Sequence, residues 1–128
     1  MNLMQLTKAE EQVMHFVWKL NEAVVKDVVE QFDEPKPAYT TVATVLSVLE
    51  KKGFVNRKKI GNTNLFSPVV SKKDYTKFQF SSLLKNYFNG SFPKMATFFA
   101  KENNLSIDEL EEMLKITESE LNKTDNKL

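Results

Sequence analysis

The sequence predicts a mainly α-helical protein with a small β-hairpin wing: a winged helix-turn-helix domain followed by a helical dimerisation domain. Three observations lead to this prediction. Apolar residues recur at helical spacing in three consecutive segments of residues 7–52. A basic segment with the period of a β-hairpin follows directly, over residues 54–66. Helical spacing then resumes after residue 70 and continues to Leu121.

The first helix is predicted to begin at a Thr-x-x-Glu sequence. The side chains of Thr7 and Glu10 can each accept a hydrogen bond from the other's backbone amide, an arrangement known as a capping box. Six apolar residues then recur at the spacing of one helix face, and they are Leu6, Ala9, Val13, Phe16, Val17 and Leu20.

Two further helices complete the predicted three-helix unit. The second covers residues 24–32 and ends before Pro35 and Pro37, because proline lacks an amide proton and restricts the preceding residue. The third covers residues 39–52, with Gly53 as its C-terminal cap. Its predicted inward-facing residues are Val42, Val45, Leu46 and Leu49.

A basic hairpin is predicted directly after the third helix. Residues 54–60 read as a strand, Gly61-Asn62 as a turn and residues 63–66 as the returning strand, which Pro68 ends. A hairpin in this position converts a helix-turn-helix into a winged one.

The second half of the chain is predicted to be helical. One helix follows the Ser71-x-x-Asp74 cap and stops at Asn89-Gly90, a short one covers residues 92–101, and the last starts at the Ser106-x-x-Glu109 capping box. The predicted domains are therefore a winged-helix domain at 1–70, a helical dimerisation domain at 71–122 and a flexible tail at 123–128.

Eight aromatic residues between Tyr75 and Phe99 give these later helices more apolar surface than short helices can bury alone. They either pack back onto the first half or pair with a second copy. We favour the second copy, because a helix-turn-helix that binds a palindrome needs a two-fold partner. The predicted dimer-interface residues are Phe80, Leu84, Tyr87, Phe88, Phe98, Phe99, Leu110 and Leu114.

Composition excludes several kinds of chemistry. The chain has no cysteine, so it has no disulfide, no thiolate zinc site and no cysteine nucleophile. It also lacks a glycine-rich phosphate loop, a metal-ligand cluster and a pair of titratable groups placed for acid–base catalysis. We therefore expect no enzyme activity, cofactor, metal or small-molecule substrate. No signal pattern or membrane-spanning apolar run is present, and the expected location is cytoplasmic.

Charge is unevenly distributed although the net charge is only +1. Residues 36–100 are basic, whereas the segments on either side are acidic. A basic middle fits a molecule that presents one face to a polyanion, although an ordinary solvated surface would show the same pattern.

The predicted outer face of the third helix carries short hydroxyl side chains beside a cation. Hydroxyl groups can bond phosphate oxygens or base edges, and a threonine methyl can contact a thymine methyl. Threonine is also ordinary on an exposed helix, and Thr40 is a possible N-cap. On the hairpin, Arg57 and Lys59 share one face and suit phosphate contacts better than Lys58. The predicted DNA-binding residues are Tyr39, Thr40, Thr41, Thr44, Ser47, Lys51, Arg57, Lys59 and Asn62.

Four segments carry a family resemblance: LTKAEEQVM from Leu6, VKDV from Val25, AYTTVATVL from Ala38 and LEKKGFV from Leu49. With these segments the chain resembles the penicillinase repressor family of the BlaI/MecI type. The similarity continues through VSKKDY from Val70 and FAKENNLS from Phe99, and so covers nearly the whole chain.

The resemblance implies a homodimeric repressor whose winged halves bind an inverted repeat with TACA/TGTA half-sites and whose C-terminal helices form the dimer interface. It also implies a membrane sensor peptidase, or a protease downstream of it, as a partner that triggers cleavage in the C-terminal region. The matching candidate cleavage position is Phe98-Phe99.

Three features depart from the family pattern. Val48 stands where the family often has Arg or Lys, and Phe98-Phe99 stands where antibiotic-responsive members are cut between Asn and Phe. The cysteine-rich metal motif of the copper-responsive CopY branch is absent. A winged-helix protein-interaction module without operator binding is therefore the alternative, and failure to bind any duplex at low salt would favour it.

Overall fold

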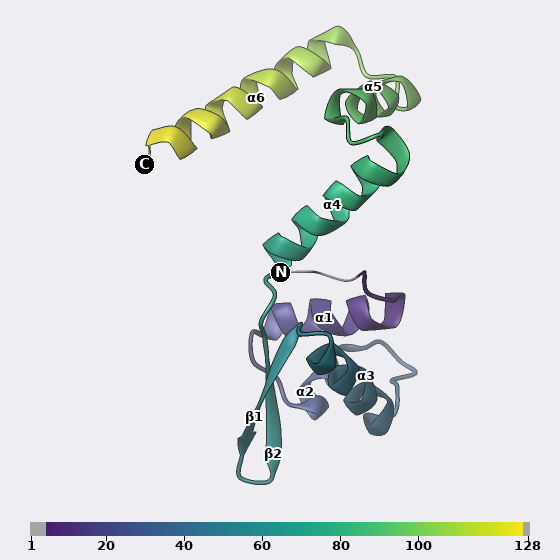
Figure 1. Cartoon of the computed structure of the whole chain (residues 1–128), viewed down its shortest axis with the longest axis vertical. Coiled ribbons are helices and arrows are strands. Elements are labelled where there is room, and N and C mark those ends of the chain that lie inside the picture. The colour runs from purple at the N-terminus through teal and green to yellow at the C-terminus, as the bar shows by residue number, and fades with distance from the viewer. Residues whose placement is uncertain (1–4, 127–128) are drawn as a thin grey trace. The chain divides into compact units, whose positions relative to one another are not determined.

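The computed structural model describes residues 5–126, with side chains described through residue 123. The elements run in the order α1 (Lys8–Leu20), α2 (Val25–Gln31), α3 (Tyr39–Lys51), β1 (Val55–Ile60), β2 (Thr63–Pro68), α4 (Lys72–Phe88), α5 (Phe92–Glu102) and α6 (Ile107–Asn126) (Figure 1). The chain forms two compact units, and the boundary between them in the sequence lies between Ser82 and Leu83. No helix in the described part is long and apolar enough to cross a membrane.

Helix α1 begins as the sequence predicts. The Thr7 hydroxyl oxygen accepts a hydrogen bond from the Glu10 amide at 3.2 Å, and the Glu10 carboxylate accepts one from the Thr7 amide at 2.9 Å. Both bonds satisfy amides that the first helical turn leaves unpaired. The capping box is therefore confirmed.

Helix α3 ends in a glycine-dependent turn. Gly53 adopts a φ of +83°, the left-handed region that suits glycine. The Phe54 amide donates to the Leu49 carbonyl at 2.9 Å and the Gly53 amide donates to the Glu50 carbonyl at 3.0 Å, which together form a Schellman motif. This turn directs the chain from α3 straight into β1.

One apolar core holds the first unit together. Its fully buried side chains come from α1, α2, α3 and the hairpin, and the largest are Phe54, Phe66, Met14, Leu46 and Leu49. Val45, predicted to face inward with Val42, Leu46 and Leu49, is only partly buried. The start of α4 also belongs to this core, because Tyr75 is buried in it and Phe78 packs against it.

The hairpin is anchored to the helices by a short bridge. Strands β1 and β2 pair antiparallel with Arg57 opposite Phe66, and Figure 1 shows them extending beyond the three helices. Phe66 also exchanges two backbone hydrogen bonds with Ala23, in the α1–α2 connection, at 2.8 and 2.9 Å. The root of the wing is thereby fixed, whereas its tip is exposed.

The second unit contains the end of α4 together with α5 and α6. None of the described residues of α5 and α6 is buried, although both helices are amphipathic. The predicted tail at 123–128 overlaps the end of α6, which continues to Asn126, and residues 127–128 lie outside the described residues.

Candidate nucleic-acid interface

Helix α3 presents a polar face to solvent because its apolar face is held in the core. Val42, Leu46 and Leu49 are buried. The exposed side chains away from this face are Thr40, Thr41, Thr44 and Lys51. Tyr39 begins the helix on the same side as Val42 and is nevertheless exposed. The helix N-cap is Ala38, so Thr40 lies within the first turn and is not the cap residue. Four of the predicted contact residues therefore share one accessible helix surface.

The Thr44 hydroxyl donates a hydrogen bond within helix α3. Its Oγ1 donates to the Thr40 carbonyl at 2.9 Å, one turn earlier. That bond turns the hydroxyl back toward the helix backbone. The groups that Thr44 can still offer to a ligand are its methyl group and an oxygen lone pair, which suit a thymine methyl or a base amino group.

The wing supplies the cations next to α3. Lys58 and Lys59 are exposed on β1, and Asn62 is exposed in the turn after Gly61. Ile60, at the end of β1, is 54% exposed. The wing tip thus combines two ammonium groups with a small polar turn.

Arg57 is directed toward α3. Its Nη2 donates to Ser47 Oγ at 2.9 Å and lies 3.1 Å from Glu50 Oε1. Its guanidinium carbon lies 5.0 Å from the centre of the Phe66 ring. Arg57 Nε is buried and donates to no group in the described part of the chain. The structure therefore brings predicted residues Arg57 and Ser47 into contact with each other, and the Arg57 side chain is 32% exposed.

Glu50 is a component of this region that the sequence analysis did not identify. It lies three residues after Ser47 on α3, so both side chains fall on the same helix face. An acidic residue in an otherwise basic segment was the available signal, but only the position of β1 reveals that Arg57 neutralises it.

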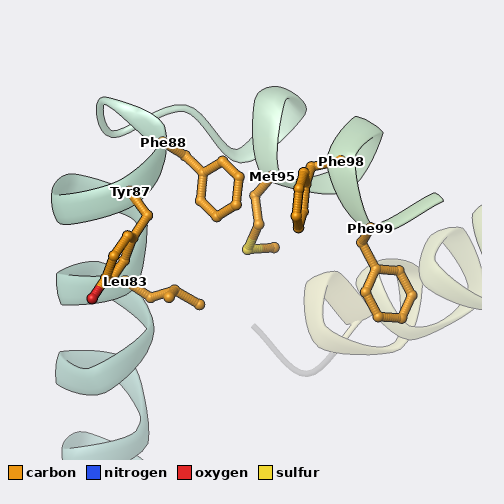
Figure 2. Close-up of a pocket in the computed structure, with 6 residues that line it drawn as sticks. All are labelled: Leu83, Tyr87, Phe88, Met95, Phe98 and Phe99. Atoms are coloured by element: carbon orange, nitrogen blue, oxygen red, sulfur yellow. The ribbon is translucent and has the colours of Figure 1, made fainter. Parts of the chain in front are cut away.

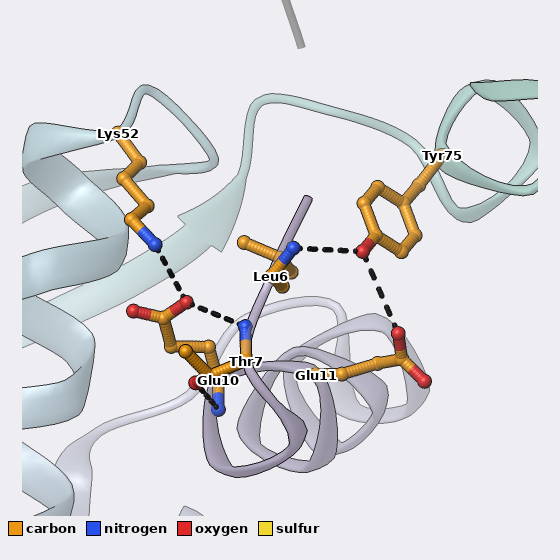
Figure 3. Close-up of polar contacts among 6 residues, drawn as sticks. All are labelled: Leu6, Thr7, Glu10, Glu11, Lys52 and Tyr75. Atoms are coloured by element: carbon orange, nitrogen blue, oxygen red, sulfur yellow. Dashed lines mark hydrogen bonds and ion pairs between the residues drawn. The ribbon is translucent and has the colours of Figure 1, made fainter. Parts of the chain in front are cut away.

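The end of α3 is tied to α1 by a second ion pair. Lys52 Nζ lies 2.7 Å from Glu10 Oε1, and both side chains are largely buried (Figure 3). Burial alone would raise the pKa of Glu10, but the hydrogen bonds from Lys52 and from the Thr7 amide outweigh it and lower that pKa. The ammonium group of Lys52 is thus paired with a carboxylate of α1, whereas its neighbour Lys51 is exposed.

The second unit contains an apolar hollow of about 650 Å³. Figure 2 shows Phe88, Met95 and Phe98 turned toward one another, and the Phe88 and Phe98 rings lie 5.6 Å apart. Tyr87 is 75% exposed and Phe98 54% exposed. The hollow is lined by Leu83, Tyr87, Phe88, Met95, Phe98 and Phe99.

This hollow gathers four of the predicted dimer-interface residues and two that were not predicted. Tyr87, Phe88, Phe98 and Phe99 line it, and the additional residues are Leu83 and Met95. The remaining predicted residues lie outside the lining: Leu84 is half-buried, whereas Phe80, Leu110 and Leu114 are exposed.

Comparison with known proteins gives a consistent result. The family model described as penicillinase repressor matches residues 6–119. The penicillinase repressor of Bacillus licheniformis is 28% identical over 120 residues, which are 93% of this chain and 94% of that protein. The methicillin resistance regulatory protein MecI of Staphylococcus aureus strain N315 is 26% identical over 113 residues, which are 88% of this chain and 92% of that protein.

A solved structure resembles the first unit. The solution structure of the DNA-binding domain of the repressor BlaI superposes with a TM-score of 0.50 and 28% identity, covering 58% of this chain and 92% of that domain. The predicted winged helix-turn-helix is therefore confirmed, as is the helical character of the region that follows it.

Proposed function

Because this chain belongs to the penicillinase repressor family, a family of transcriptional repressors and not of enzymes, we propose that it is a homodimeric repressor that binds a palindromic operator. The carrying observation is the exposed hydroxyl-rich face of α3, flanked by the lysines of the wing on the same compact unit. A cytoplasmic location follows from this role.

Helix α3 is proposed to enter the major groove. Tyr39, Thr40, Thr41 and Thr44 are all exposed and, apart from Tyr39, short enough to let the helix approach the base edges closely. Lys51, Lys59 and Asn62 would hold the phosphates on either side. The names of the similar Bacillus licheniformis penicillinase repressor and of the BlaI DNA-binding domain support DNA binding by this unit, and the residue roles rest on exposure and charge.

A second copy is proposed to cover the apolar surface of the second unit. The hollow between the end of α4 and α5 is almost wholly apolar, and Tyr87, Phe98 and Phe99 in its lining are each more than half exposed. Burying such surface against another chain is favourable by about 25 cal/mol per Å². A two-fold partner would also place two copies of α3 on the two half-sites of a palindrome.

Release of the operator is proposed to use proteolysis in α5. The candidate bond Phe98-Phe99 lies inside the helix Phe92–Glu102, and both side chains are exposed. A protease needs an extended backbone, so the bond is cut only when α5 opens locally, and a helix without buried residues opens at low cost. The proposed partner is a membrane sensor peptidase or a protease downstream of it.

Fluorescence-anisotropy titrations test the operator proposal. The labelled duplexes are a TACA/TGTA palindrome and a scrambled sequence of the same composition, each measured across a salt series. We expect selective binding of two chains to the palindrome, and loss of selectivity in the double variant Thr40→Ala/Thr41→Ala. The matched control is Thr76→Ala, an exposed threonine on α4 that should leave selectivity unchanged.

The alternative function, a winged-helix protein-interaction module, predicts a different result. Val48, where the family often has a cation, is the observation that favours it. This module predicts that the parent binds the palindrome and the scrambled duplex weakly and equally, and that the double variant and the control bind them in the same way. That result would contradict the repressor proposal and favour the interaction module.

A further inference from the structure

Arg57 joins three elements at one point of the winged unit. It extends from β1, lies over the ring of Phe66 on β2, and reaches Ser47 and Glu50 on α3. Phe66 is itself 2% exposed and bridged to the α1–α2 connection through Ala23. The Phe66–Ala23 bridge holds the wing to the α1–α2 connection, and Arg57 adds a side-chain link from the wing to α3.

The guanidinium group of Arg57 is poorly placed to serve as a phosphate ligand. Nη2 is engaged by Ser47 and Glu50 at 2.9 and 3.1 Å, and Nε is buried. A bidentate phosphate contact needs two neighbouring N–H groups that point outward. Two of the three guanidinium nitrogens are therefore engaged or covered, whereas the exposed ammonium group of Lys59 carries no such constraint.

From this geometry, and resting on the proposed operator binding, we propose that Arg57 is a positioning residue that fixes the angle between the wing and α3. The wing contacts phosphates beside the groove that α3 enters, so this angle sets whether both elements fit one duplex at once. Arg57 therefore contributes to operator preference through geometry. Its pairing with Glu50 also neutralises the one carboxylate of α3, which would otherwise repel the phosphates.

The two roles of Arg57 differ in their dependence on salt. Loss of a phosphate contact makes the plot of log affinity against log salt shallower by about 0.9 per contact, for every duplex. Loss of a positioning contact leaves this slope unchanged and reduces the preference for the operator over other duplexes. The double variant Glu50→Gln/Arg57→Met separates the two roles, because it keeps the net charge of the parent and removes the link.

The experiment compares the parent, Glu50→Gln/Arg57→Met, Glu50→Gln and the control Lys59→Gln. Duplexes enriched by the parent from a random pool define its preferred site, so no operator sequence is assumed. Anisotropy titrations over a salt series then give the slope and the ratio of affinities for the preferred and a scrambled duplex. Circular dichroism melting reports whether each variant folds.

We expect the double variant to keep the parent's salt slope and to lose roughly tenfold in preference, the scale of one charge-assisted hydrogen bond. Lys59→Gln should keep the preference and flatten the slope by about 0.9 per contact. A double variant that instead behaves like Lys59→Gln would overturn the positioning role and make Arg57 a phosphate ligand.

The remaining outcomes are also decisive. If the double variant does not fold, the single variant Glu50→Gln provides the test, because it weakens the link and leaves Arg57 in place. A reduced preference for the selected duplex in Glu50→Gln supports the inference, and an unchanged preference overturns it. If the parent enriches no duplex, the proposed operator binding and this inference both fail. If the parent prefers one duplex and the variants keep that preference, only the inference fails.

Discussion

The phenolic oxygen of Tyr75 accepts a hydrogen bond from the backbone amide of Leu6 at 3.0 Å, across 69 residues of sequence. Tyr75 is 4% exposed, and its hydroxyl proton points toward Glu11 Oε2 at 3.5 Å (Figure 3). Burial raises the pKa of Tyr75, so the phenol stays protonated and can both accept and donate. This contact joins the start of α4 to the entrance of α1.

The variant Tyr75→Phe tests what this contact contributes to stability. The ring would still fill the core, but the Leu6 amide would lose its acceptor, and an unpaired buried amide costs about 1–3 kcal/mol. We expect the free energy of unfolding in urea to fall by that amount. The control Tyr87→Phe removes a hydroxyl from a side chain that is 75% exposed and should change stability little. Equal effects of the two substitutions would contradict the assignment.

The ion pair between Glu10 and Lys52 makes the free energy of unfolding depend on pH. The pKa of Glu10 is lowered in the folded protein, so below the ordinary glutamate value of about 4.3 the unfolded chain binds more protons. The contribution of this carboxylate is therefore present above that pH and is lost as the pH falls through the lower, folded pKa.

The measurement is the urea unfolding free energy of the parent and of Glu10→Gln between pH 7 and pH 3. We expect Glu10→Gln to be less stable at pH 7 and the difference to shrink as the pH falls. Glu120→Gln is the control, because Glu120 pairs with Lys123 at 3.4 Å on an exposed helix surface, where such pairs contribute little. A constant difference between parent and Glu10→Gln across this pH range would show that the carboxylate charge is not responsible.

The contrast between local and distant contacts explains which features could be predicted from the sequence. The Thr7–Glu10 capping box and the Gly53 turn depend on residues within five positions of one another, and the sequence predicts both. The contacts of Arg57 with Ser47 and Glu50 require the path of β1 after that turn. Strand alternation predicts which side chains share a face, but it does not show which element covers that face.

The same reasoning applies to the start of α4. Helical spacing predicts a helix after Ser71, but it does not show that Tyr75 packs in the first unit, because the partner amide lies at Leu6. The bridge between Ala23 and Phe66 was not predicted for a similar reason: a single residue pair in a connection has no period. The predicted domain boundary at residue 70 and the predicted site residues stay predictions.

Thr44 is a proposed DNA contact, and substitutions there test which of its chemical groups would determine the base preference. Its hydroxyl proton is donated to the Thr40 carbonyl, so we expect its methyl group to carry the preference at one half-site position. Thr44→Val keeps a methyl group at that place and should retain the preference. Thr44→Ser removes the methyl and should weaken it by about 0.8 kcal/mol, the value of one buried methylene-sized group. Duplexes that vary single half-site positions, read by anisotropy, give the measurement; loss of preference in Thr44→Val alone would assign the readout to the oxygen.

The apolar hollow of the second unit predicts how dimerisation can be disrupted. Phe98 lines the hollow from α5, and a charge there would have to be desolvated if a second copy covered the surface. We expect sedimentation equilibrium to give two chains per particle for the parent and one for Phe98→Glu. Lys101→Glu introduces the same carboxylate on the same helix, at an exposed position outside the hollow lining, and should remain dimeric. Because the proposed dimer would place two α3 helices on one palindrome, Phe98→Glu should also lose palindrome preference. It should keep the melting transition of the first unit, whose core contains no residue of α5. A dimeric Phe98→Glu variant would move the interface away from this hollow, and a monomeric parent would show that the apolar surface serves another purpose.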